Sequence, residues 1–505
     1  MKWDAVVLTA RDLAQKQAFE AELADLFYHL NEFGERFIVY EDQPQNIRIG
    51  SGGATLRALY NLREQFGESF SQWRAIIIHS GGLSQRLPSA SALGKVFMLL
   101  PNAKTFLEMK LRSYRPVLEA MEFPGVVVCA SDTLEYIPSG IRIGVYEITL
   151  FAHVSTIEVA REHGVYVLEE GHLCRVLQKP TDEELWLNDA LIHQKDILPK
   201  NGNVGLRNES EEATEESKGQ KYALTDSFFI LSGNIINDLI ELVRNIPIEC
   251  ETCCYGDFLR ALGTSPSWNY LEVAGPLARA RRVYADVFRH RSTEVVQLPK
   301  NSFFHFGTVS EVLTHFSPSS IFISRFQMIP RQCIYSITGP NFQIGERSII
   351  EFCDFRCGAH IGSDCVISGC SSTHHVIIPD RVIASTIAVK PTTSYSTSLC
   401  SKMLYFVTIA FSLDDNLKTK SVSDGLCWFS HVIKPKSSHD TLWNMPLFRV
   451  CTSASESLDA TLYAITNGPP PMASARERLL LSMADALRTK NVLQMLKYRR
   501  TTKRI

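Results

Sequence analysis

The sequence predicts an α/β protein with a mostly parallel sheet, followed by a short parallel β-helix and a mixed C-terminal region. Three observations predict this class: apolar runs alternate with helical spacing up to about residue 330, a 17-residue repeat occupies residues 334–384, and the pattern becomes irregular after residue 400. Strands that alternate with helices favour a sheet covered on both faces, whereas a short-period repeat favours stacked coils. The expected domains are therefore residues 1–330, 331–400 and 401–505.

The elements of the first 130 residues follow from their apolar patterns. Short apolar or β-rich runs predict strands at residues 4–9, 37–41, 75–79 and 125–130. Helical apolar spacing predicts helices at residues 12–30 and after residue 50, where Leu56, Leu59 and Leu62 fall on one face. This order of elements is typical of a parallel sheet.

Two of these strands end in residues that suit a ligand. The run at 75–79 leads into Gly81-Gly82, and the run at 125–130 leads into Ser131-Asp132. In open parallel sheets, ligands bind outside the carboxyl ends of the strands. Both segments are therefore candidates for a binding site.

The loop after residue 79 has the residues that a phosphate site needs. From residue 79 to residue 88 the sequence is HSGGLSQRLP, with Gly94-Lys95 following. Paired glycines let successive N–H groups form an anion-binding nest. Arg86 adds a planar cation that grips phosphate through two bonds, and Lys95 adds a second positive charge. The spacing matches neither the P-loop nor the dinucleotide fingerprint.

A second glycine-rich segment, residues 50–55, opens the next predicted helix. Gly52 and Gly53 permit backbone angles that suit either a nucleotide contact or a tight turn between strand and helix. The sequence leaves both interpretations open.

The repeat in residues 334–384 predicts stacked coils. Ile344-Gly345, Ile361-Gly362 and Ile378-Pro379 follow one another at 17 residues, and apolar residues recur about every six. This pattern is typical of a parallel β-helix of about three coils. A plain β-sandwich segment is the alternative.

Composition and charge exclude several classes of protein. The chain has 505 residues with 52 basic and 54 acidic side chains, a formal net charge of −2, so it has no basic excess for nucleic acid. No apolar stretch reaches 18 residues, which predicts no transmembrane helix. Its 13 cysteines cannot all pair within the chain, which favours reduced thiols in the cytoplasm.

Three local features have competing explanations. The glutamate-rich segment at about 201–221 is expected to be a disordered surface insertion, with a regulatory loop as the alternative. Cys250, Cys253 and Cys254 are expected to be buried thiols, since a zinc site needs four ligands. A final helix over 473–498 leads into basic residues at 497–504, expected to form a solvated helix end.

These motifs together resemble the sugar-nucleotide pyrophosphorylases, whose signature is Gly-x-Gly-(Thr/Ser)-x-Arg with a lysine downstream. The closer resemblance is to the fucose-1-phosphate guanylyltransferases, or GDP-L-fucose pyrophosphorylases. Segments in the same order along the chain carry it: residues 3–10, 49–56, 78–95, 225–229, 255–263 and 304–308. This chain departs from the signature in reading Gly-Gly-Leu-Ser, and its aspartate lies in Ala-Ser-Asp.

The resemblance implies a nucleotidyltransferase with a Rossmann-like sheet and a left-handed parallel β-helix. The implied reaction joins L-fucose 1-phosphate and GTP into GDP-L-fucose and pyrophosphate, with Mg²⁺ as cofactor. Gly81, Gly82, Ser84 and Gln85 would cradle the triphosphate. Arg86 would hold the β- and γ-phosphates, and Lys95 would stabilise charge at the α-phosphate.

The resemblance also implies a metal site and a sugar-phosphate contact. Asp132 matches the first Mg²⁺ aspartate, Asp257 is the candidate for the second, and Asp226 is its rival. Asp132 and Asp257 could instead cap helices, and Asp226 could be a turn residue. Lys179 matches the lysine that contacts the sugar phosphate, although turn chemistry before Pro180 would also explain it.

The resemblance leaves other functions open. A pyrophosphorylase for another sugar 1-phosphate or another nucleotide would use the same phosphate-binding motifs. A catalytically silent sugar-nucleotide-binding regulatory subunit would keep binding without turnover. Self-association through the faces of the β-helix is compatible with all of these.

Overall fold

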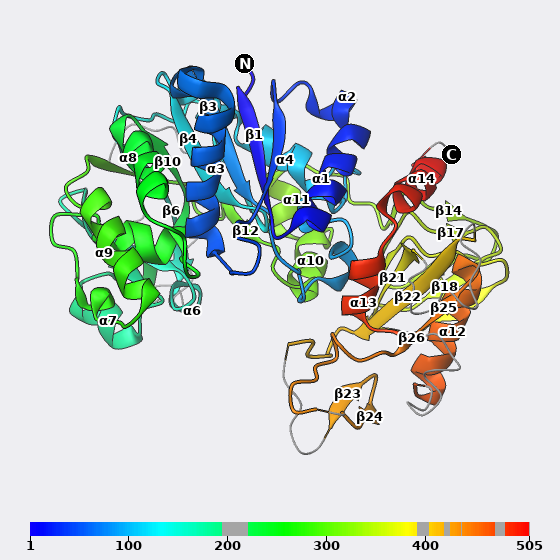
Figure 1. The fold of residues 1–505 in the computed structure, drawn as a ribbon. Helices are drawn as coiled ribbons and strands as arrows, with labels where there is room; N and C mark the ends of the chain where they lie inside the picture. Colours follow the sequence, from blue (N-terminus) through cyan, green and yellow to red (C-terminus); the bar gives the residue numbers. More distant parts are fainter. Residues whose placement is uncertain (194–220, 391–402, 419–424, 436, 470–479, 504–505) are drawn as a thin grey trace. The chain divides into compact units, whose positions relative to one another are not determined.

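Two compact units make up the protein (Figure 1). The computed structural model describes residues 1–193, 221–390, 403–418, 425–435, 437–469 and 480–503. The first unit comprises Met1–Lys16, Phe27–Gly82 and Met109–Phe304, and the second comprises Gln17–Leu26, Leu83–Glu108 and His305–Ile505. The chain therefore passes from one unit to the other several times. The acidic segment expected at about 201–221 lies outside the described residues, apart from Lys221.

A 10-stranded sheet forms the centre of the first unit. Its strands are β1 (Ala5–Ala10), β2 (Phe37–Glu41), β3 (Arg74–His79), β4 (Gly125–Ala130), β6 (Ile148–Thr156), β7 (Gly164–Glu169), β8 (His172–Gln178), β9 (Ile192–His193), β10 (Lys221–Ser232) and β11 (Thr293–Gln297). The main order is β11-β6-β10-β4-β3-β1-β2, with β7, β8 and β9 attached through β10. The predicted α/β class and large, mostly parallel sheet are confirmed.

Within the main order of strands, β10 breaks the parallel pattern, and the attached strands β7 and β8 also pair antiparallel. The pairs β1–β2, β1–β3, β3–β4 and β11–β6 are parallel, whereas β10 runs antiparallel to both β4 and β6. Apolar runs indicate a buried strand but not its direction, so the sequence could not predict this reversal.

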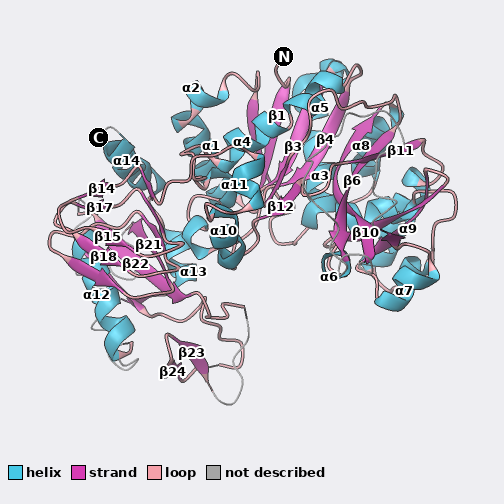
Figure 2. Ribbon diagram, turned by 180° about the vertical axis from the view of Figure 1, so that it is seen from behind, coloured by secondary structure: helices cyan, strands magenta, loops and turns pink. Residues whose placement is uncertain are grey.

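Helices cover the sheet because both of its faces are apolar. Val7, Ile77 and Val128 are buried on one face together with apolar residues of α3 (Gly50–Phe66), α8 (Asn234–Asn245) and α9 (Pro276–Phe288). The alternate residues Val6 and Ile76 are also fully buried. Figure 2 shows β1, β3 and β4 side by side. The predicted residues Leu56, Leu59 and Leu62 belong to this core.

Shorter elements complete the first unit. They are α2 (Phe27–Leu30), η1 (Gly67–Gln72), α5 (Arg115–Ala120), β5 (Thr133–Glu135), α6 (Ile157–Ala160), α7 (Asp182–Leu187), the π-helical turn η6 (Cys254–Phe258), η7 (Leu259–Ala261) and η8 (Asn269–Leu271). Three elements contribute residues to both units: α1 (Leu13–Asp25), α4 (Phe106–Ser113) and β12 (Phe303–His305). The helix predicted over 12–30 is thus α1 followed by α2.

Parallel ladders with a 17-residue spacing dominate the second unit. Ile344 pairs with Ile361, and Ile361 with Ile378; on another ladder, Ile349 pairs with Val366, and Val366 with Ile383. The strands are β13 (Cys333–Ile334), β14 (Ile337–Thr338), β15 (Gln343–Ile344), β16 (Ile349–Glu351), β17 (Asp354–Phe355), β18 (Ala359–Ile361), β19 (Val366–Ser368), β20 (Val376–Ile378) and β21 (Val382–Val389). This register confirms the repeat that the sequence predicts.

The ladders continue into an antiparallel and helical region. It contains β22 (Tyr405–Ser412), β23 (Leu426–Trp428), β24 (His431–Ile433), β25 (Phe448–Cys451), α12 (Ala454–Asn467), β26 (Leu480–Leu481), α13 (Met483–Thr489) and α14 (Val492–Lys503). The remaining elements of this unit are η2 (Pro88–Ala90), η3 (Lys95–Phe97), α10 (Val309–Phe316) and α11 (Ile321–Arg325). Among the residues that the structure describes, no helix is both long and apolar enough to cross a membrane.

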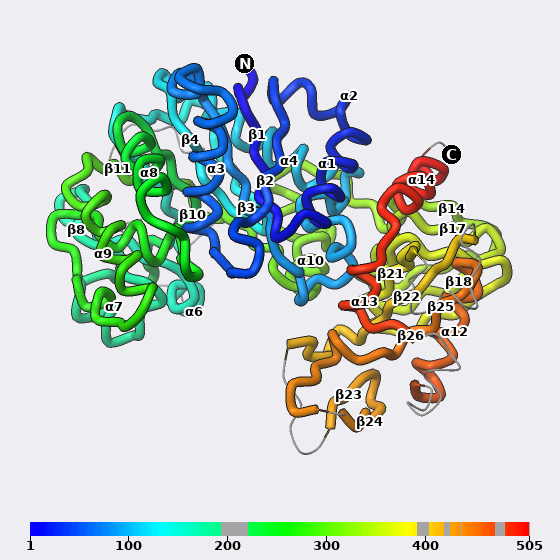
Figure 3. Tube along the Cα trace, viewed as in Figure 1, coloured from blue at the N-terminus to red at the C-terminus, as the bar shows by residue number. Residues whose placement is uncertain are grey.

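The C-terminal helix pairs with α1 (Figure 3). Arg499 lies 3.5 Å from Glu22, and Lys503 lies 3.6 Å from Asp25, which also contacts Arg500. The expectation of a solvated helix end is therefore wrong for Arg499 and Lys503, because acidic residues far away in the sequence neutralise them. The helix expected over 473–498 also differs: residues 483–503 form two helices, α13 and α14.

Candidate functional site

The carboxyl ends of three parallel strands bring the predicted loop residues to one edge of the sheet. Since β1, β3 and β4 are neighbours and parallel, the segments that follow them begin at the same edge. Ser131 N donates a 3.1 Å hydrogen bond to His79 O, which ties the end of β4 to the end of β3. Gly81, Gly82 and Asp132 follow directly, as the sequence predicts.

Two side chains near the N-terminus hold the glycine turn after β3. Thr9 Oγ1 accepts from Ser80 N at 3.1 Å and from Gly81 N at 3.4 Å. Gln15 accepts from Gly82 N at 3.3 Å and donates to Gly82 O at 2.8 Å. The bonds from the two glycine N–H groups are long, so a phosphate oxygen could replace their acceptors. Thr9 lies in one of the segments that carry the family resemblance, but its contact with the glycine turn, like that of Gln15, cannot be read from the sequence because both residues lie about 70 positions away.

His79, at the end of β3, is a neutral side chain that joins β3 to α3. Thr55 Oγ1 donates to Ser51 O at 2.9 Å and therefore accepts from His79 Nε2 at 3.0 Å. Burial lowers the pKa of His79 to about 4, so the ring stays uncharged near neutral pH. Its contacts are structural.

The glycine-rich start of α3 packs tightly against the segment around Thr252. Gly52 N donates to Thr252 O at 2.9 Å. A Cβ atom at Gly52 would lie 2.7 Å from Thr252 Oγ1, and one at Gly53 would lie 2.6 Å from the Cβ of Ile49. Close packing therefore explains both glycines. Their nucleotide-binding role stays a prediction.

Asp226 lies on the part of β10 that extends toward the end of β4, which Asp132 follows. Because β10 is antiparallel to β4 and Phe229 faces Val128, the residues before Phe229 extend past the carboxyl end of β4. Asp226 is buried, and its Oδ1 lies 3.5 Å from His163 Nδ1. A carboxylate at this place is a candidate metal ligand.

Gln178 ends β8 beside Asp226, and Lys179 follows it in the sequence. A Cβ atom at Gly164 would lie 2.5 Å from Asp226 Oδ2 and 3.3 Å from Gln178 Oε1, so the two side chains share the space that this glycine leaves. Gln178 Oε1 is buried and has no hydrogen-bond partner within the described ranges. Lys179 is exposed, with its Nζ 3.7 Å from Glu162 Oε2.

Asp257 lies in the π-helical turn η6 and has both carboxylate oxygens engaged. Oδ1 accepts from Arg281 Nε at 2.6 Å, and Oδ2 accepts from Cys253 N at 2.7 Å. The side chain is 6% exposed. The carboxylate is thus neutralised by an arginine and stabilises the start of the turn.

The neighbouring cysteines are free thiols. Cys254 is fully buried, which raises the pKa of its thiol well above the usual range, whereas Cys250 and Cys253 are half-buried. Within the described part of the chain, no three histidine, cysteine, aspartate or glutamate side chains are grouped so that they could hold a metal ion.

The second unit contains the rest of the signature loop. Ser84 has a φ of +50°, and its carbonyl accepts from Leu87 N at 2.8 Å. Gln85 is half-buried and Arg86 is exposed. Val309, the first residue of α10, donates from its N–H to Arg86 O at 3.2 Å. These bonds fix the backbone from which the arginine extends.

Lys95 begins the short helix η3 in the same unit and is half-buried. Gly94 precedes it with a φ of +102°, and a Cβ atom there would lie 2.4 Å from the ring of Phe19. Glycine is required here both for the backbone angle and for this contact. The glycine before the predicted lysine therefore has a packing reason that the sequence alone does not show.

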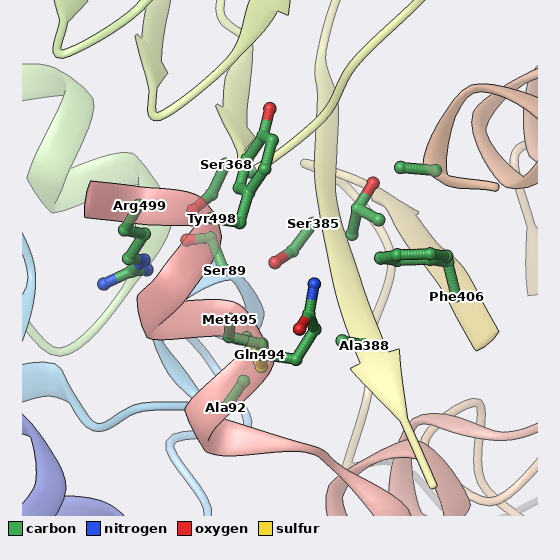
Figure 4. A pocket seen from close by; sticks show the side chains of 13 residues that line it. Ser89, Ala92, Ser368, Ser385, Ala388, Phe406, Gln494, Met495, Tyr498 and Arg499 are labelled. Carbon is green, nitrogen blue, oxygen red and sulfur yellow. The ribbon is translucent and has the colours of Figure 1, made fainter. Parts of the chain in front are cut away.

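A pocket of about 490 Å³, partly open to solvent, lies within the second unit (Figure 4). Ser89 and Ala92, which lie between Arg86 and Lys95 in the sequence, are among its lining residues. Ser385 of β21 and Gln494 of α14 line it as well. Its only charged lining residue is Arg499, which is paired with Glu22.

Comparison with known proteins shows which protein family has a sequence like this one. The fucose pyrophosphorylase domain matches residues 67–453. Human fucose-1-phosphate guanylyltransferase is 29% identical over 561 residues, covering 98% of this chain and 90% of that protein. The mouse protein of the same name is 30% identical over 566 residues, covering 98% and 92%.

A plant protein matches a smaller part of the chain. The bifunctional fucokinase/GDP-fucose pyrophosphorylase of Arabidopsis thaliana is 24% identical over 412 residues, which is 72% of this chain and 36% of that protein. The family match spans most of the chain and includes the signature loop, Asp132, Asp226 and Asp257. The chain therefore belongs to the fucose pyrophosphorylase family.

Proposed function

We propose that this protein transfers GMP from GTP to L-fucose 1-phosphate, giving GDP-L-fucose and pyrophosphate. The similarity over 98% of the chain to two relatives named fucose-1-phosphate guanylyltransferase carries the proposal. The glycine turn, Arg86, Lys95 and Asp132 are all present, which is the chemistry that phosphate substrates need.

We also propose the finer architecture that the family resemblance implies. Residues 1–330 are assigned to a Rossmann-like nucleotidyltransferase domain, 331–400 to a left-handed parallel β-helix and 401–505 to an α+β region ending in a basic helix. The 17-residue register of the parallel ladders supports the β-helix. A cytoplasmic location and self-association remain predictions of the sequence.

In the proposed reaction, a phosphate oxygen of the sugar attacks the α-phosphorus of GTP. The new O–P bond forms as the bond between the α-phosphorus and the bridging oxygen breaks, and pyrophosphate leaves with that oxygen. The main barrier is repulsion between two polyanions: one like-charge contact at 4 Å costs about 1 kcal/mol in water and about 4 kcal/mol at an effective dielectric of 20. Cations and N–H donors lower this barrier.

Each proposed role follows from the chemistry of the side chain. Gly81, Gly82, Ser84 and Gln85 cradle the triphosphate, and Lys179, exposed at the end of β8, binds the sugar phosphate. Arg86 is exposed and its carbonyl is anchored by α10, so its guanidinium is available to the β- and γ-phosphates. Lys95 stabilises the charge that develops at the α-phosphate.

Two carboxylates fit a Mg²⁺ ion at the carboxyl end of β4. Mg²⁺ takes one or two carboxylates beside phosphates and waters, and when bound it neutralises phosphate charge. Asp132 follows β4, and Asp226 extends past it on β10. Asp257 stays a candidate, but because Arg281 and Cys253 already engage both of its oxygens, we favour Asp226 as the second ligand.

The deciding experiment measures pyrophosphate release from purified protein with Mg²⁺ and L-fucose 1-phosphate. GTP, ATP, UTP and CTP are offered in parallel to wild type, to Lys95→Ala, and to Lys434→Ala as an exposed control in the same unit. If wild type releases pyrophosphate with GTP alone, the result would support the proposed substrate. If this release falls about a hundredfold or more in Lys95→Ala but not in Lys434→Ala, it would also support the role of Lys95.

Other outcomes point to other functions. Release with a different nucleotide would keep the enzyme class and change the substrate. Nucleotide binding without release, also with other sugar 1-phosphates, would favour the catalytically silent binding protein. Normal turnover in Lys95→Ala would remove that residue from the mechanism.

A further inference from the structure

Lys110 of α4 and Glu135 of β5 form a fully buried ion pair in the first unit. Lys110 Nζ lies 3.1 Å from Glu135 Oε2, and both side chains are 0% exposed. Burying two charges sacrifices their hydration, and apolar residues of similar shape often stabilise a protein equally well or better. Fold stability therefore gives no reason for placing charges here.

The bonds of this pair converge on the residues directly after Asp132. Lys110 Nζ donates to Thr133 O at 2.7 Å and to Thr133 Oγ1 at 3.4 Å. The Thr133 hydroxyl donates to Glu135 Oε1 at 2.6 Å, so both oxygens of Glu135 accept a bond. Ser113 of α4 also donates to the carbonyl of Glu135. Residues 133–135 are thus fixed to α4.

Asp132 is consequently held from both sides. On its N-terminal side, Ser131 N donates to His79 O on β3. On its C-terminal side, the Thr133 carbonyl accepts from Lys110. We propose that Lys110 and Glu135 are positioning residues that fix the backbone around Asp132, so that its carboxylate is directed to a divalent cation. This inference rests on the metal role assigned to Asp132 under the proposed function.

A purely structural role predicts a different result from a positioning role. If the pair only fills space, a Met and Leu pair of similar size would replace it without affecting metal binding. If the pair positions Asp132, the same replacement leaves the fold intact but loosens the carboxylate. Residues that orient metal ligands typically change metal affinity about 10–100-fold when replaced.

The test compares Lys110→Met/Glu135→Leu with the control Arg115→Met/Glu119→Leu, which removes an exposed ion pair on α5. Binding of Mn²⁺ in the presence of GTP is measured from the electron paramagnetic resonance signal of free Mn²⁺. Thermal unfolding and the KM for L-fucose 1-phosphate are measured on the same samples. We expect about 10–100-fold weaker Mn²⁺ binding, an unfolding midpoint at or above that of wild type, and an unchanged KM. The control should match wild type.

Two further variants separate the possible failures. Asp132→Asn tests the metal role itself: if it binds Mn²⁺ like wild type, the metal assignment fails. If Asp132→Asn binds Mn²⁺ weakly but the double variant binds normally, the positioning inference is wrong. Should the double variant not fold, Thr133→Val decides, since it removes the hydroxyl that ties residue 133 to both Lys110 and Glu135 and leaves their direct ion pair in place. Mn²⁺ binding equal to wild type in Thr133→Val would then overturn the inference.

Discussion

At the scale of single residues, Gly164 makes room for two polar groups of the candidate site. Its missing side chain leaves the space beside Asp226 Oδ2 and Gln178 Oε1. Both groups are largely enclosed, so neither can move away without losing contacts. The Asp226 carboxylate can therefore lie where it does only because residue 164 is a glycine.

We expect Gly164→Ala to displace Asp226, because the added methyl group would lie 2.5 Å from its carboxylate oxygen. The turnover number should fall about tenfold. The Mg²⁺ concentration that gives the half-maximal rate should rise about tenfold. Steady-state kinetics over a Mg²⁺ titration measures both. The control is Gly171→Asn at the turn of the same β7–β8 hairpin, where the space is open and asparagine tolerates the positive φ. An unchanged Mg²⁺ titration in Gly164→Ala would contradict the metal role of Asp226.

The sequence predicts site residues where the signal is local. Gly81-Gly82 and Asp132 directly follow apolar strands, so their place at the carboxyl edge could be foreseen. Thr9 and Gln15 could not be found in this way, because Gln15 meets Gly82 across 67 positions in the sequence. For the same reason, the sequence left Asp226 and Asp257 as rivals, and only the contacts of Asp257 distinguish them.

At the scale of elements, the 17-residue ladders explain the glycine that follows isoleucine in the first two repeats. A Cβ atom at Gly345 would lie 2.5 Å from Ser363 N, and one at Gly362 would lie 2.5 Å from Asp380 N. The backbone of the next repeat thus leaves no room for a side chain. The sequence shows the period clearly because these contacts recur at a fixed spacing.

Gly362→Ala should therefore destabilise the second unit. Overpacking of this kind costs about 1–3 kcal/mol of unfolding free energy. Urea denaturation followed by circular dichroism measures the loss. The neighbouring substitution Ser363→Ala serves as the control and should change the unfolding free energy by less than about 0.5 kcal/mol. Equal stability of the two variants would mean that the repeats can move apart to accept a methyl group.

The pairing of α1 with α14 includes a buried carboxylate that responds to pH. Burial raises the pKa of Glu22 from 4.5 to about 7, although Arg499 and Lys503 act to lower it. The folded form holds this proton more tightly than the unfolded chain does. Glu22 therefore lowers the free energy of unfolding progressively as the pH rises from about 4.5 through about 7. The total decrease is about 3 kcal/mol.

Glu22→Gln removes this titration. Its stability relative to wild type should increase between pH 5 and pH 8, which thermal unfolding at several pH values would show. Glu20→Gln, an exposed neighbour on α1, should show a constant difference from wild type. A constant difference for Glu22→Gln as well would mean that the carboxylate is already ionised at pH 5.

At the scale of the whole molecule, the two units interleave along the chain. Residues 17–26 and 83–108 belong to the second unit, although residues of the first unit precede and follow them. Apolar periodicity identifies strands and helices but not which distant segments pack together. The four strands up to residue 130 and the 17-residue repeat could therefore be predicted, whereas the membership of these two segments could not.

We expect residues 1–304 alone not to form a stable fold. Ala92 and Leu93, which pack in the core of the ladder-containing unit, would lose most of their partners and become exposed. Circular dichroism and a urea titration of this fragment should show no cooperative transition, whereas the full chain should show one. The fragment would instead be shown to fold independently if it unfolded cooperatively and its free energy of unfolding fell with urea concentration at the slope expected for its size.

The pairing of Glu22 with Arg499 has a consequence for synthesis on the ribosome. The two residues are 477 positions apart, so the acidic face of α1 is made long before its basic partner. At 5–20 residues per second, roughly 25 to 95 seconds pass between them. During that interval Glu22 and Asp25 lack their basic partners, whereas Phe19 on the same helix can already pack against Phe97, which is made only 78 residues later.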